Sequence, residues 1–395
     1  MFDYIVIGKG LIGTAAAKYL SEEICNVAII GPDEPTGNLN NAVVFSSHYD
    51  SGRVQRVIGW DAVWTRLNAQ SVKQYPFLQK ETNIRFHEST GRLYVTPDAE
   101  DPYLKQYPEL AKEFNVTYDY FDSGELIHQH FPEYVFPSDV KATFESSPSG
   151  HINPRLLIKA QLTMFQNNGG AFFTDTVSNV TYHDSRFSIS TIEGNEFEAK
   201  KVLLSTGAFT NFLGLCKKKL AFIPKSETII LAKVSRQEAQ RLSKLPSLLY
   251  EITNDELDEI YLVKPVLYPD GNYYLKMGCN LAEDIFFKSL EEIQQWFRNG
   301  NSDAHLPIQK RELMKIIPSL SAERFSTKRC IIERTITKQP YIDMLDDRGL
   351  FVAAGGNGYG AMCSDELGRV AASLVMSGTI PGEYPAGVFR AVFEE

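Results

Sequence analysis

The sequence has few cysteines, and their arrangement suggests neither a disulfide nor a metal site. The five cysteines lie far apart and include no CxxC spacing: Cys25, Cys216, Cys279, Cys330 and Cys363. An odd number of scattered thiols excludes a disulfide framework and a zinc site of ordinary spacing. We therefore expect no metal site and a reducing, cytoplasmic environment.

Long apolar runs and concentrated positive charge are also missing. No stretch approaches the roughly 20 apolar residues that span a bilayer, and the apolar opening Phe2–Ile7 has no basic leader. The formal net charge is −9, and the one short basic run, Lys217–Lys219, is typical of a solvated loop. We therefore expect neither a membrane nor a nucleic acid among the partners.

A glycine-rich turn near the N-terminus is the first positive signal. The segment "VIGKGLIG", Val6–Gly13, lies between an apolar run and a stretch rich in small residues, and a second apolar run, Val27–Ile30, follows. This order predicts strand, tight turn, helix and strand. Gly8 permits the turn, Gly10 lets the backbone approach a pyrophosphate, and Gly13 lets the helix pack close to the sheet. The segment therefore predicts a dinucleotide site.

The acidic residue that usually binds the adenosine ribose is absent from its expected place. Gly31 stands where the second strand ends, while Asp33 and Glu34 follow in the loop. An acidic residue at the end of this strand normally accepts a hydrogen bond from the ribose. Either Asp33 or Glu34 takes over that contact, or backbone and water do.

A second strand-to-helix turn lies near the C-terminus. Residues 350–354 predict a strand, the glycine loop Gly355–Gly360 follows, and residues 364–376 predict a helix. Earlier, residues 187–192 and 196–204 predict paired strands, and the second of them ends in Thr206 and Gly207. A chain of 395 residues is also long enough for two lobes. Two such turns at opposite ends suggest a nucleotide-binding domain built from both ends of the chain.

Three further segments carry a family resemblance: "SHYDSGRVQR" (Ser47–Arg56), "YYLKMG" (Tyr273–Gly278) and the long segment Cys330–Gly360, which contains "PYID" and "GGNGYG". Together with the N-terminal cradle, they make the sequence similar to the D-amino-acid oxidase superfamily of FAD enzymes. Within it, the chain most resembles the monomeric sarcosine oxidase branch, whose members oxidise secondary amines and amino acids.

The resemblance implies an α/β fold with two interleaved domains. A Rossmann-type FAD-binding domain of the glutathione-reductase type would comprise residues 1–45, 145–215 and 326–390. A substrate domain built on an antiparallel sheet would comprise residues 46–144 and 216–325.

The resemblance also implies roles for residues around the flavin. His48 and Arg53 would lie at the isoalloxazine, and Arg56 would bind a substrate carboxylate, for which a guanidinium is well suited. Lys276 would lie beside flavin N5 and help to activate oxygen. On residue type alone, these arginines and this lysine are equally consistent with solvent-exposed side chains.

Two positions depart from the family pattern. Met362 stands where a lysine usually helps to bind the substrate carboxylate, and Tyr49 stands where a second histidine is typical. The expected substrate is therefore an N-substituted amino acid held in another way, a larger or cyclic amino acid, or an amine without a carboxylate. Sarcosine itself is not expected.

The remaining implied contacts are with FAD. Cys330 falls where related enzymes attach the flavin covalently, although a free cysteine is more commonly a small packing residue. The other residues expected along FAD are Gly8, Gly10, Leu11, Ile12, Gly13, Asp33, Ser47, Val177, Thr206, Gly207, Gly355, Gly356, Asn357, Gly358, Tyr359 and Gly360.

The expected function is FAD-dependent oxidation of a C–N bond in an amine or N-substituted amino acid. Hydride transfer to flavin N5 would give an imine that water hydrolyses, and O2 would reoxidise the flavin and yield H2O2. The alternatives are a dehydrogenase with another electron acceptor, or a flavin-binding subunit with a degenerate site. We expect a monomer or small homo-oligomer.

Overall fold

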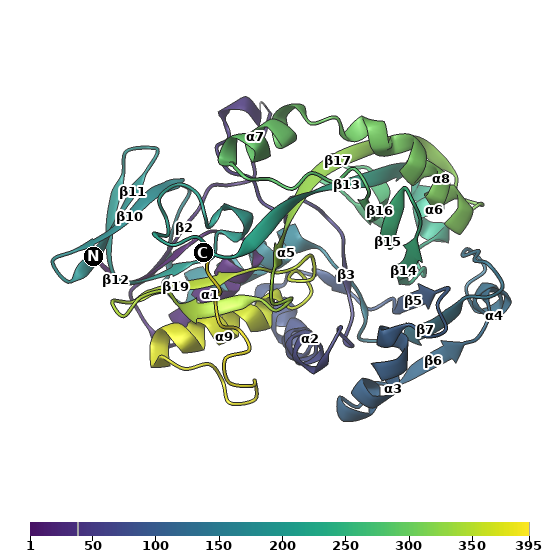
Figure 1. Cartoon of the computed structure of the whole chain (residues 1–395), viewed down its shortest axis with the longest axis horizontal. Coiled ribbons are helices and arrows are strands. Elements are labelled where there is room, and N and C mark those ends of the chain that lie inside the picture. The colour runs from purple at the N-terminus through teal and green to yellow at the C-terminus, as the bar shows by residue number, and fades with distance from the viewer. Residues whose placement is uncertain (38, 395) are drawn as a thin grey trace.

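The computed structural model describes residues 1–37 and 39–394, which form two large sheets joined through a small one (Figure 1). The first sheet takes its strands from distant parts of the chain, in the order β10-β11-β12-β1-β2-β9, with β19 beside β12 and β18 beside β19. The pairs β12-β1, β1-β2, β2-β9 and β12-β19 are parallel, whereas β10-β11, β11-β12 and β18-β19 are antiparallel. Its strands are β1 (Phe2–Ile7), β2 (Val27–Ile30), β9 (Ala171–Phe173), β10 (Val177–His183), β11 (Arg186–Thr191), β12 (Glu196–Leu204), β18 (Tyr341–Met344) and β19 (Leu350–Ala354).

Both faces of this sheet are buried. Ile5 and Ile7 of β1 pack in one apolar cluster and Val6 packs in another, and all three side chains are almost completely inaccessible. Burial on both faces is characteristic of parallel strands covered by helices. The helices that pack with one another on this sheet are α1 (Leu11–Glu23), α2 (Ala62–Thr82), α5 (Pro154–Asn167) and α9 (Ser364–Ser377).

Small residues explain the close packing of α1 against α9. A methyl group added at Gly368 would collide with Ala15 and with the backbone of Ala16. The helices therefore approach each other as closely as their backbones allow, and the first and last helices of the chain lie side by side. The predicted nucleotide-binding fold from both chain ends is confirmed in this respect.

The second sheet is mainly antiparallel, with the order β17-β13-β16-β15-β14-β5-β7-β6. Its strands are β5 (Arg92–Thr96), β6 (Tyr118–Phe121), β7 (Lys141–Glu145), β13 (Phe222–Val234), β14 (Ser247–Thr253), β15 (Leu257–Leu267), β16 (Tyr273–Leu281) and β17 (Ala322–Thr335). The accompanying helices are α3 (Pro102–Glu113), α4 (Gly124–His130), α6 (Arg236–Arg241), α7 (Leu290–Asn299) and α8 (Leu306–Ile316).

Short elements connect the two large sheets. A small sheet has the order β3-β8-β4, with β3 (Arg53–Gln55), β8 (Gly150–Ile152) and β4 (His87–Glu88). Single 3-10 turns are η1 (Leu39–Asn41), η2 (Gly207–Phe209) and η3 (Ser302–His305). In Figure 1 the long strands β13 and β17 extend from the middle of the molecule toward its upper right.

Local sequence signals explain several element boundaries. Asn153 accepts a hydrogen bond from Leu156 N at 3.2 Å, and Pro154 follows it, so a capping side chain and a proline in the first turn define the start of α5. The predicted pair of strands around Gly194 is also present, as antiparallel β11 and β12.

The mixed α/β class with an antiparallel second sheet is thus confirmed, whereas the exact domain boundaries stay a prediction. The strand β17 continues across the predicted boundary at residue 326.

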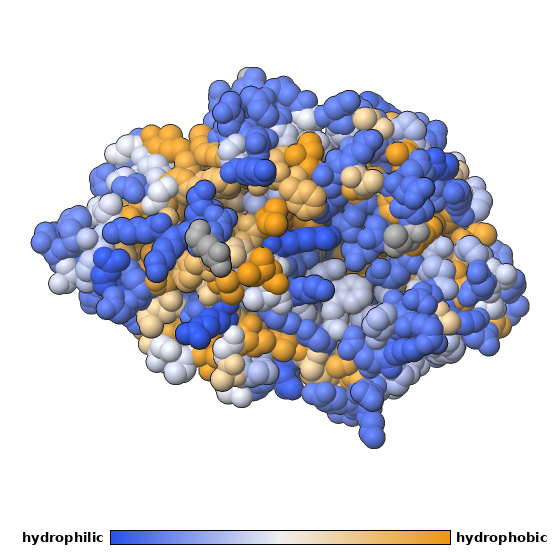
Figure 2. Space-filling model, viewed as in Figure 1, coloured by the Kyte–Doolittle hydropathy of each residue, from blue (hydrophilic) through white to orange (hydrophobic). Residues whose placement is uncertain are grey.

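The surface offers no membrane-spanning element in the described ranges: none of their helices combines the length and apolar character needed to cross a bilayer. On the face shown in Figure 2, hydrophobic side chains gather in the middle of the molecule and hydrophilic ones surround them.

Candidate active site

The N-terminal glycine turn is built as the sequence predicts. Gly8 has φ +111°, and an added methyl group would overlap the carbonyl oxygen of Ser205, so only glycine fits there. Gly13 is also tightly enclosed, because a methyl group would overlap the carbonyl oxygen of Gly8. Gly10 differs from both, since a methyl group would meet only Nδ1 of His48, at 3.8 Å. The backbone of Gly10 therefore faces open space.

That open space is a cavity of about 290 Å³ between the two large sheets. The helix α1 starts at its edge without a side-chain cap, so the first amides of α1 lack the usual partner. Predicted cofactor residues that line this cavity are Gly8, Gly10, Leu11, Ile12, Ser47, Val177, Thr206, Gly207, Cys330, Gly356, Asn357, Gly358, Tyr359 and Gly360. The structure thus brings the two glycine turns and the intervening segments together.

Three predicted cofactor residues do not line the cavity. Gly13 supports the turn from behind, and Gly355, with φ +81°, lies against the side chain of Thr335. Asp33 is paired with Lys9, and its side chain is 72% exposed. The alternative, Glu34, accepts two hydrogen bonds of 2.6 Å from Arg155. Neither carboxylate lies in the cavity wall, so the ribose contact stays a prediction.

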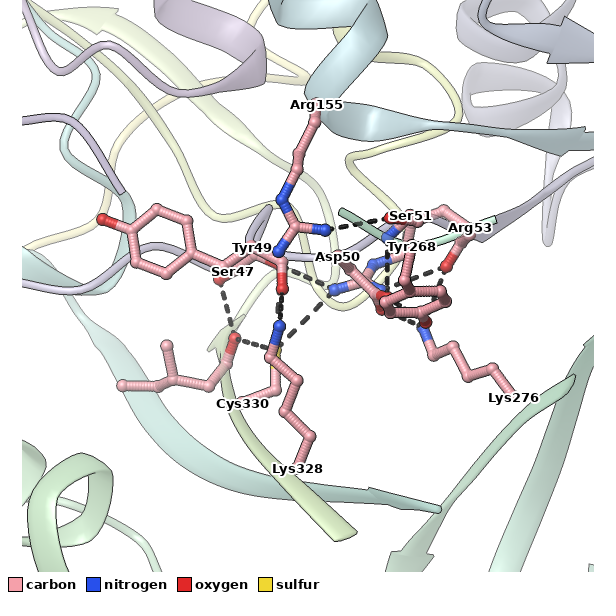
Figure 3. A network of polar contacts seen from close by, with 12 residues as sticks. Ser47, Tyr49, Asp50, Ser51, Arg53, Arg155, Tyr268, Lys276, Lys328 and Cys330 are labelled. Carbon is pink, nitrogen blue, oxygen red and sulfur yellow. Dashed lines mark hydrogen bonds and ion pairs between the residues drawn. The ribbon is translucent and has the colours of Figure 1, made fainter. Parts of the chain in front are cut away.

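A buried carboxylate, Asp50, organises the polar residues beside the cavity (Figure 3). It forms ion pairs with Arg53 and with Lys276, whose Nζ is 2.7 Å from Asp50 Oδ2. Tyr268 donates a hydrogen bond of 2.6 Å to the other carboxylate oxygen. Two cations share one carboxylate, so the cluster carries net positive charge when both are protonated.

Lys276 is completely buried, which rules out the solvent-exposed alternative. Its ammonium donates a hydrogen bond of 3.0 Å to the carbonyl of Gly52 and lies 5.0 Å from the ring centroid of Tyr261, which lines the cavity. Burial lowers the pKa of Lys276 well below its ordinary value, and the charge of Arg53 adds to this effect. The carboxylate of Asp50 opposes both by favouring the charged form.

His48 and Tyr49 occupy different places. His48 lines the cavity beside Gly10, and burial together with nearby cations, of which Arg155 contributes most, lowers its pKa to about 3. His48 is therefore a neutral imidazole at ordinary pH. Tyr49 lines a neighbouring cavity instead, and burial raises its pKa to about 12.

Arg53 and Cys330 meet at the cavity wall. Arg53 donates a hydrogen bond of 2.6 Å to the carbonyl of Ser47, and the same nitrogen lies 3.8 Å from Cys330 Sγ. Cys330 is partly exposed and lines both this cavity and its neighbour. The other four cysteines do not line the cavity.

Arg56 is buried under aromatic rings and does not line the cavity. Its guanidinium carbon lies 4.5 Å from the ring centroid of Trp60, 5.3 Å from that of Tyr103 and 5.7 Å from that of Tyr359. The Nε atom has no hydrogen-bond partner within the described residues. Of these rings, Tyr359 lines the cavity, so it stands between Arg56 and the open space.

The cavity wall also contains residues that the sequence did not single out. Met362 lines it as expected, and beside it lie Glu227, Glu259, Tyr261, Asn280, Glu333 and Arg334. Asn280 connects two of them, because it donates to Glu259 at 2.7 Å and accepts from Arg334 at 3.0 Å. Each comes from the antiparallel sheet, where only the strand register decides which side chains reach the cavity. No local motif could have identified them.

Comparison with known proteins identifies a family that agrees with the cavity described above. Residues 3–374 match the protein family described as FAD dependent oxidoreductase. The chain belongs to this family. It is 23% identical over 381 residues to monomeric sarcosine oxidase of Bacillus sp. (strain B-0618), covering 95% of this chain and 93% of the relative. It is 26% identical over 219 residues to N-methyl-L-tryptophan oxidase of Yersinia pestis (strain Pestoides F), covering 54% of this chain and 55% of the relative.

Solved structures share the fold at low sequence identity. NikD, described as an unusual amino acid oxidase essential for nikkomycin biosynthesis, superposes with a TM-score of 0.75 at 17% identity, covering 99% of this chain and 98% of its own. L-proline dehydrogenase from P. horikoshii gives 0.74 at 18% identity, with 98% and 96% coverage. These neighbours include both an oxidase and a dehydrogenase.

The residues present fit the FAD that the family uses. The open backbone face of Gly10 and the uncapped first turn of α1 suit a pyrophosphate, because unpaired amides at a helix N-terminus bind anions. The second glycine loop closes the other end of the same cavity. This FAD-dependent oxidoreductase therefore has one continuous space for a dinucleotide between its two sheets.

Proposed function

We propose that this FAD-dependent oxidoreductase oxidises the C–N bond of a small amine or N-substituted amino acid and passes the electrons to O2. The observation that carries the proposal is the buried ammonium of Lys276, held by Asp50 directly behind the cavity wall. A fixed positive charge at this place stabilises the negative charge that develops when dioxygen accepts an electron. An exposed lysine would have offered no such advantage, because water screens its charge.

Bound FAD would supply the hydride acceptor, leaving an imine that water hydrolyses, and O2 would leave as H2O2. The protein must hold the substrate in place, and it must remove the proton from the ammonium form of the substrate. Glu227 lines the cavity, and burial raises its pKa, as suits a group that takes a proton from the ammonium form of a substrate. Tyr261 and Met362 shape the space beside it.

The cavity wall favours an amine over an amino acid as substrate. Glu259 lines it, and its carboxylate would repel a substrate carboxylate. Glu227, whose pKa is raised by burial and which pairs with Lys225 at 3.2 Å, would repel it less. Arg56, the predicted carboxylate-binding residue, lies behind Tyr359, and Arg334 already donates to Asn280. The methionine at position 362 removes the second cation that the family pattern provides.

We also propose that Cys330 attaches FAD covalently through a thioether: the thiol and a flavin methyl group would each give up a proton, and the two electrons released would reduce the flavin, which O2 would reoxidise. Its Sγ atom is accessible to the cavity, beside Arg53 and opposite Glu227 in the neighbouring strand. The competing interpretation, a packing residue, describes Cys279 and Cys363 better, because both are fully buried. A covalent bond would raise the flavin's reduction potential and so favour hydride acceptance.

The decisive experiment follows the flavin in purified protein. The visible spectrum is recorded, the flavin is then reduced anaerobically with a panel of amines and N-methyl amino acids, and H2O2 is measured in air. Bleaching by amines with H2O2 release supports the proposal. Bleaching without H2O2 would identify a dehydrogenase, and no bleaching by any member would favour a degenerate flavin-binding subunit.

Location and assembly state complete the proposal. The five free cysteines are consistent with a reducing cytoplasm. We propose a monomer or small homo-oligomer, which sedimentation of the flavin-loaded protein would decide.

A further inference from the structure

Glu333 is a buried carboxyl group that faces the cofactor cavity without a cationic partner. It lies on β17, three residues after Cys330, and only 9% of its surface is exposed. Within residues 1–37 and 39–394 it forms no ion pair, and no charged side chain shifts its pKa. A buried carboxylate without a cation is costly, so such a group needs a specific reason to be there.

Its surroundings place it between the C-terminal glycine loop and η2. Oε1 accepts a hydrogen bond from the amide of Gly356 at 3.2 Å. On the other side lies Gly207, where an added methyl group would stand 3.7 Å from Oε1. Both glycines line the cavity, and the loop that contains Gly356 is the segment the sequence places along the flavin. The carboxyl group therefore reaches the cavity at the cofactor rather than at its outer rim.

None of the elements packed around Glu333 presents a titratable side chain to it. Pro224 is its partner on β13, Gly207 belongs to η2, and Gly355, Gly356 and Asn357 form the loop after β19. Burial raises the pKa of Glu333, and the backbone amides of Gly355 and Gly356 oppose this only in part. Burial without a cation favours the neutral carboxylic acid, whose O–H group needs an acceptor.

We propose that Glu333 is a protonated carboxylic acid that donates a hydrogen bond to the bound flavin and thereby couples flavin reduction to its own ionisation. Flavin carbonyl and ring nitrogen atoms are acceptors, and hydrogen bonds to them tune the cofactor's electronics. Reduction places negative charge on the flavin. The neutral acid stabilises that charge, whereas the ionised form repels it. The inference rests on FAD binding by the family and is independent of the proposed substrate.

The direction of the coupling between flavin reduction and the ionisation of Glu333 can be measured. Glu333 holds its proton to higher pH in the reduced protein than in the oxidised one, because the reduced flavin disfavours a second negative charge. Between those two pKa values, reduction takes up one additional proton. The midpoint potential of the wild-type protein therefore falls more steeply with pH in that interval than the flavin alone requires.

The test measures the midpoint potential of the FAD-loaded protein against pH by equilibration with redox dyes, so no substrate is involved. Wild type is compared with Glu333→Gln, which keeps a neutral hydrogen-bond donor of the same size. The two potentials should agree at low pH and diverge as pH rises, with the wild type lower and its slope steeper by one proton per two electrons. Parallel curves over the whole range would overturn the proposal.

A second measurement gives its main result on the wild-type protein, and variants serve only to assign the signal to Glu333. The infrared difference spectrum between oxidised and dithionite-reduced wild type should contain a band from the C=O stretch of a protonated carboxyl that changes on reduction. The band should be lost in Glu333→Gln and shifted in Glu333→Asp. A wild-type spectrum without any such band would overturn the proposal whatever the substrate proves to be.

Discussion

Asp50 and Lys276 form a buried ion pair that joins the start of the small sheet to the antiparallel sheet, with Oδ2 and Nζ 2.7 Å apart. The side chain of Lys276 has no exposure to solvent, and that of Asp50 only 2%. The pair explains how an ammonium persists in a place where burial alone lowers the pKa of Lys276. It also means that the charge of Lys276 depends on Asp50, a residue of the segment Ser47–Arg56 to which the resemblance assigned no role.

Replacing Lys276 with Met should slow the reaction of reduced enzyme with O2 by about two orders of magnitude or more, on the scale of losing one preorganised electrostatic contact. Anaerobic reduction by substrate should change far less. Stopped-flow absorbance separates the two half-reactions. Lys264→Met, which removes another buried lysine, serves as control because Lys264 pairs with Glu88 outside the cofactor cavity. Equal slowing of both half-reactions would contradict the assigned role.

Asp50→Asn should destabilise the protein by about 3–5 kcal/mol, since it leaves the buried Lys276 without its partner charge. Urea unfolding of the FAD-loaded protein measures this change. The double variant Asp50→Asn/Lys276→Met should be less destabilised than the sum of the single variants, because it leaves no buried charge unpaired in this pair. Strict additivity would show that the ion pair is energetically unimportant.

Gly10→Val should weaken FAD binding without unfolding the protein. Its side chain has room beside His48 but extends into the cavity where the cofactor lies, so the affinity should fall by at least about tenfold, or 1.4 kcal/mol. Flavin fluorescence titration of the apoprotein measures affinity, and circular dichroism measures folding. Gly8→Ala is the contrasting variant, because a methyl group there collides with Ser205 and should impair folding itself. Normal FAD affinity in Gly10→Val would refute the cradle assignment.

Cys330→Ser should convert the flavin from acid-stable to acid-extractable. Wild-type protein precipitated with acid is expected to keep its yellow colour, and the variant to release it into the supernatant. Cys216→Ser is a matched control, because Cys216 is also partly exposed but does not line the cavity. Complete release of colour from the wild type would rule out the thioether.

Glu251→Gln should stabilise the protein at high pH and have little effect at pH 4. Burial and the neighbouring carboxylate of Glu259 raise the pKa of Glu251 to about 8. The folded state therefore binds a proton that the unfolded state has lost, and wild-type stability falls as pH rises from about 4.5 to about 8. Above that interval the variant should be more stable by ~2–4 kcal/mol, at about 1.4 kcal/mol for each tenfold change in an ionisation constant. A stability difference independent of pH would contradict this.

The sequence predicted the parts of the site that depend on local backbone geometry. Gly8 and Gly13 lie where only glycine fits, and the turn they form can be read from their spacing with the flanking strand and helix. The same holds for the loop Gly356–Gly360, which follows a short buried strand. Such features are fixed within a few residues and need no knowledge of distant contacts.

The substrate side could not be predicted in this way. Glu227, Glu259 and Asn280 reach the cavity because β13, β15 and β16 pair in a particular register, with irregularities in β15 that redirect its side chains. A shift of one residue would point each of them to the opposite face. Likewise, the positions of Arg56 and Lys276 relative to the cavity depend on long-range packing. The residue types suggested what chemistry these side chains could perform, but the sequence did not predict that both are buried.

The position of β17 implies a further, structural role for the cofactor, which would connect the two large sheets. Cys330 and Glu333 belong to the antiparallel sheet, whereas Gly8 and Gly10 lie in the turn after β1 of the first sheet, and all four line one cavity. A dinucleotide held at one end by the glycines and, as proposed, tethered at the other to Cys330 would cross-link two halves of the molecule whose sheets pack around different cores. Attachment can then occur only after both halves have assembled, so the yellow colour of the protein would report completed folding.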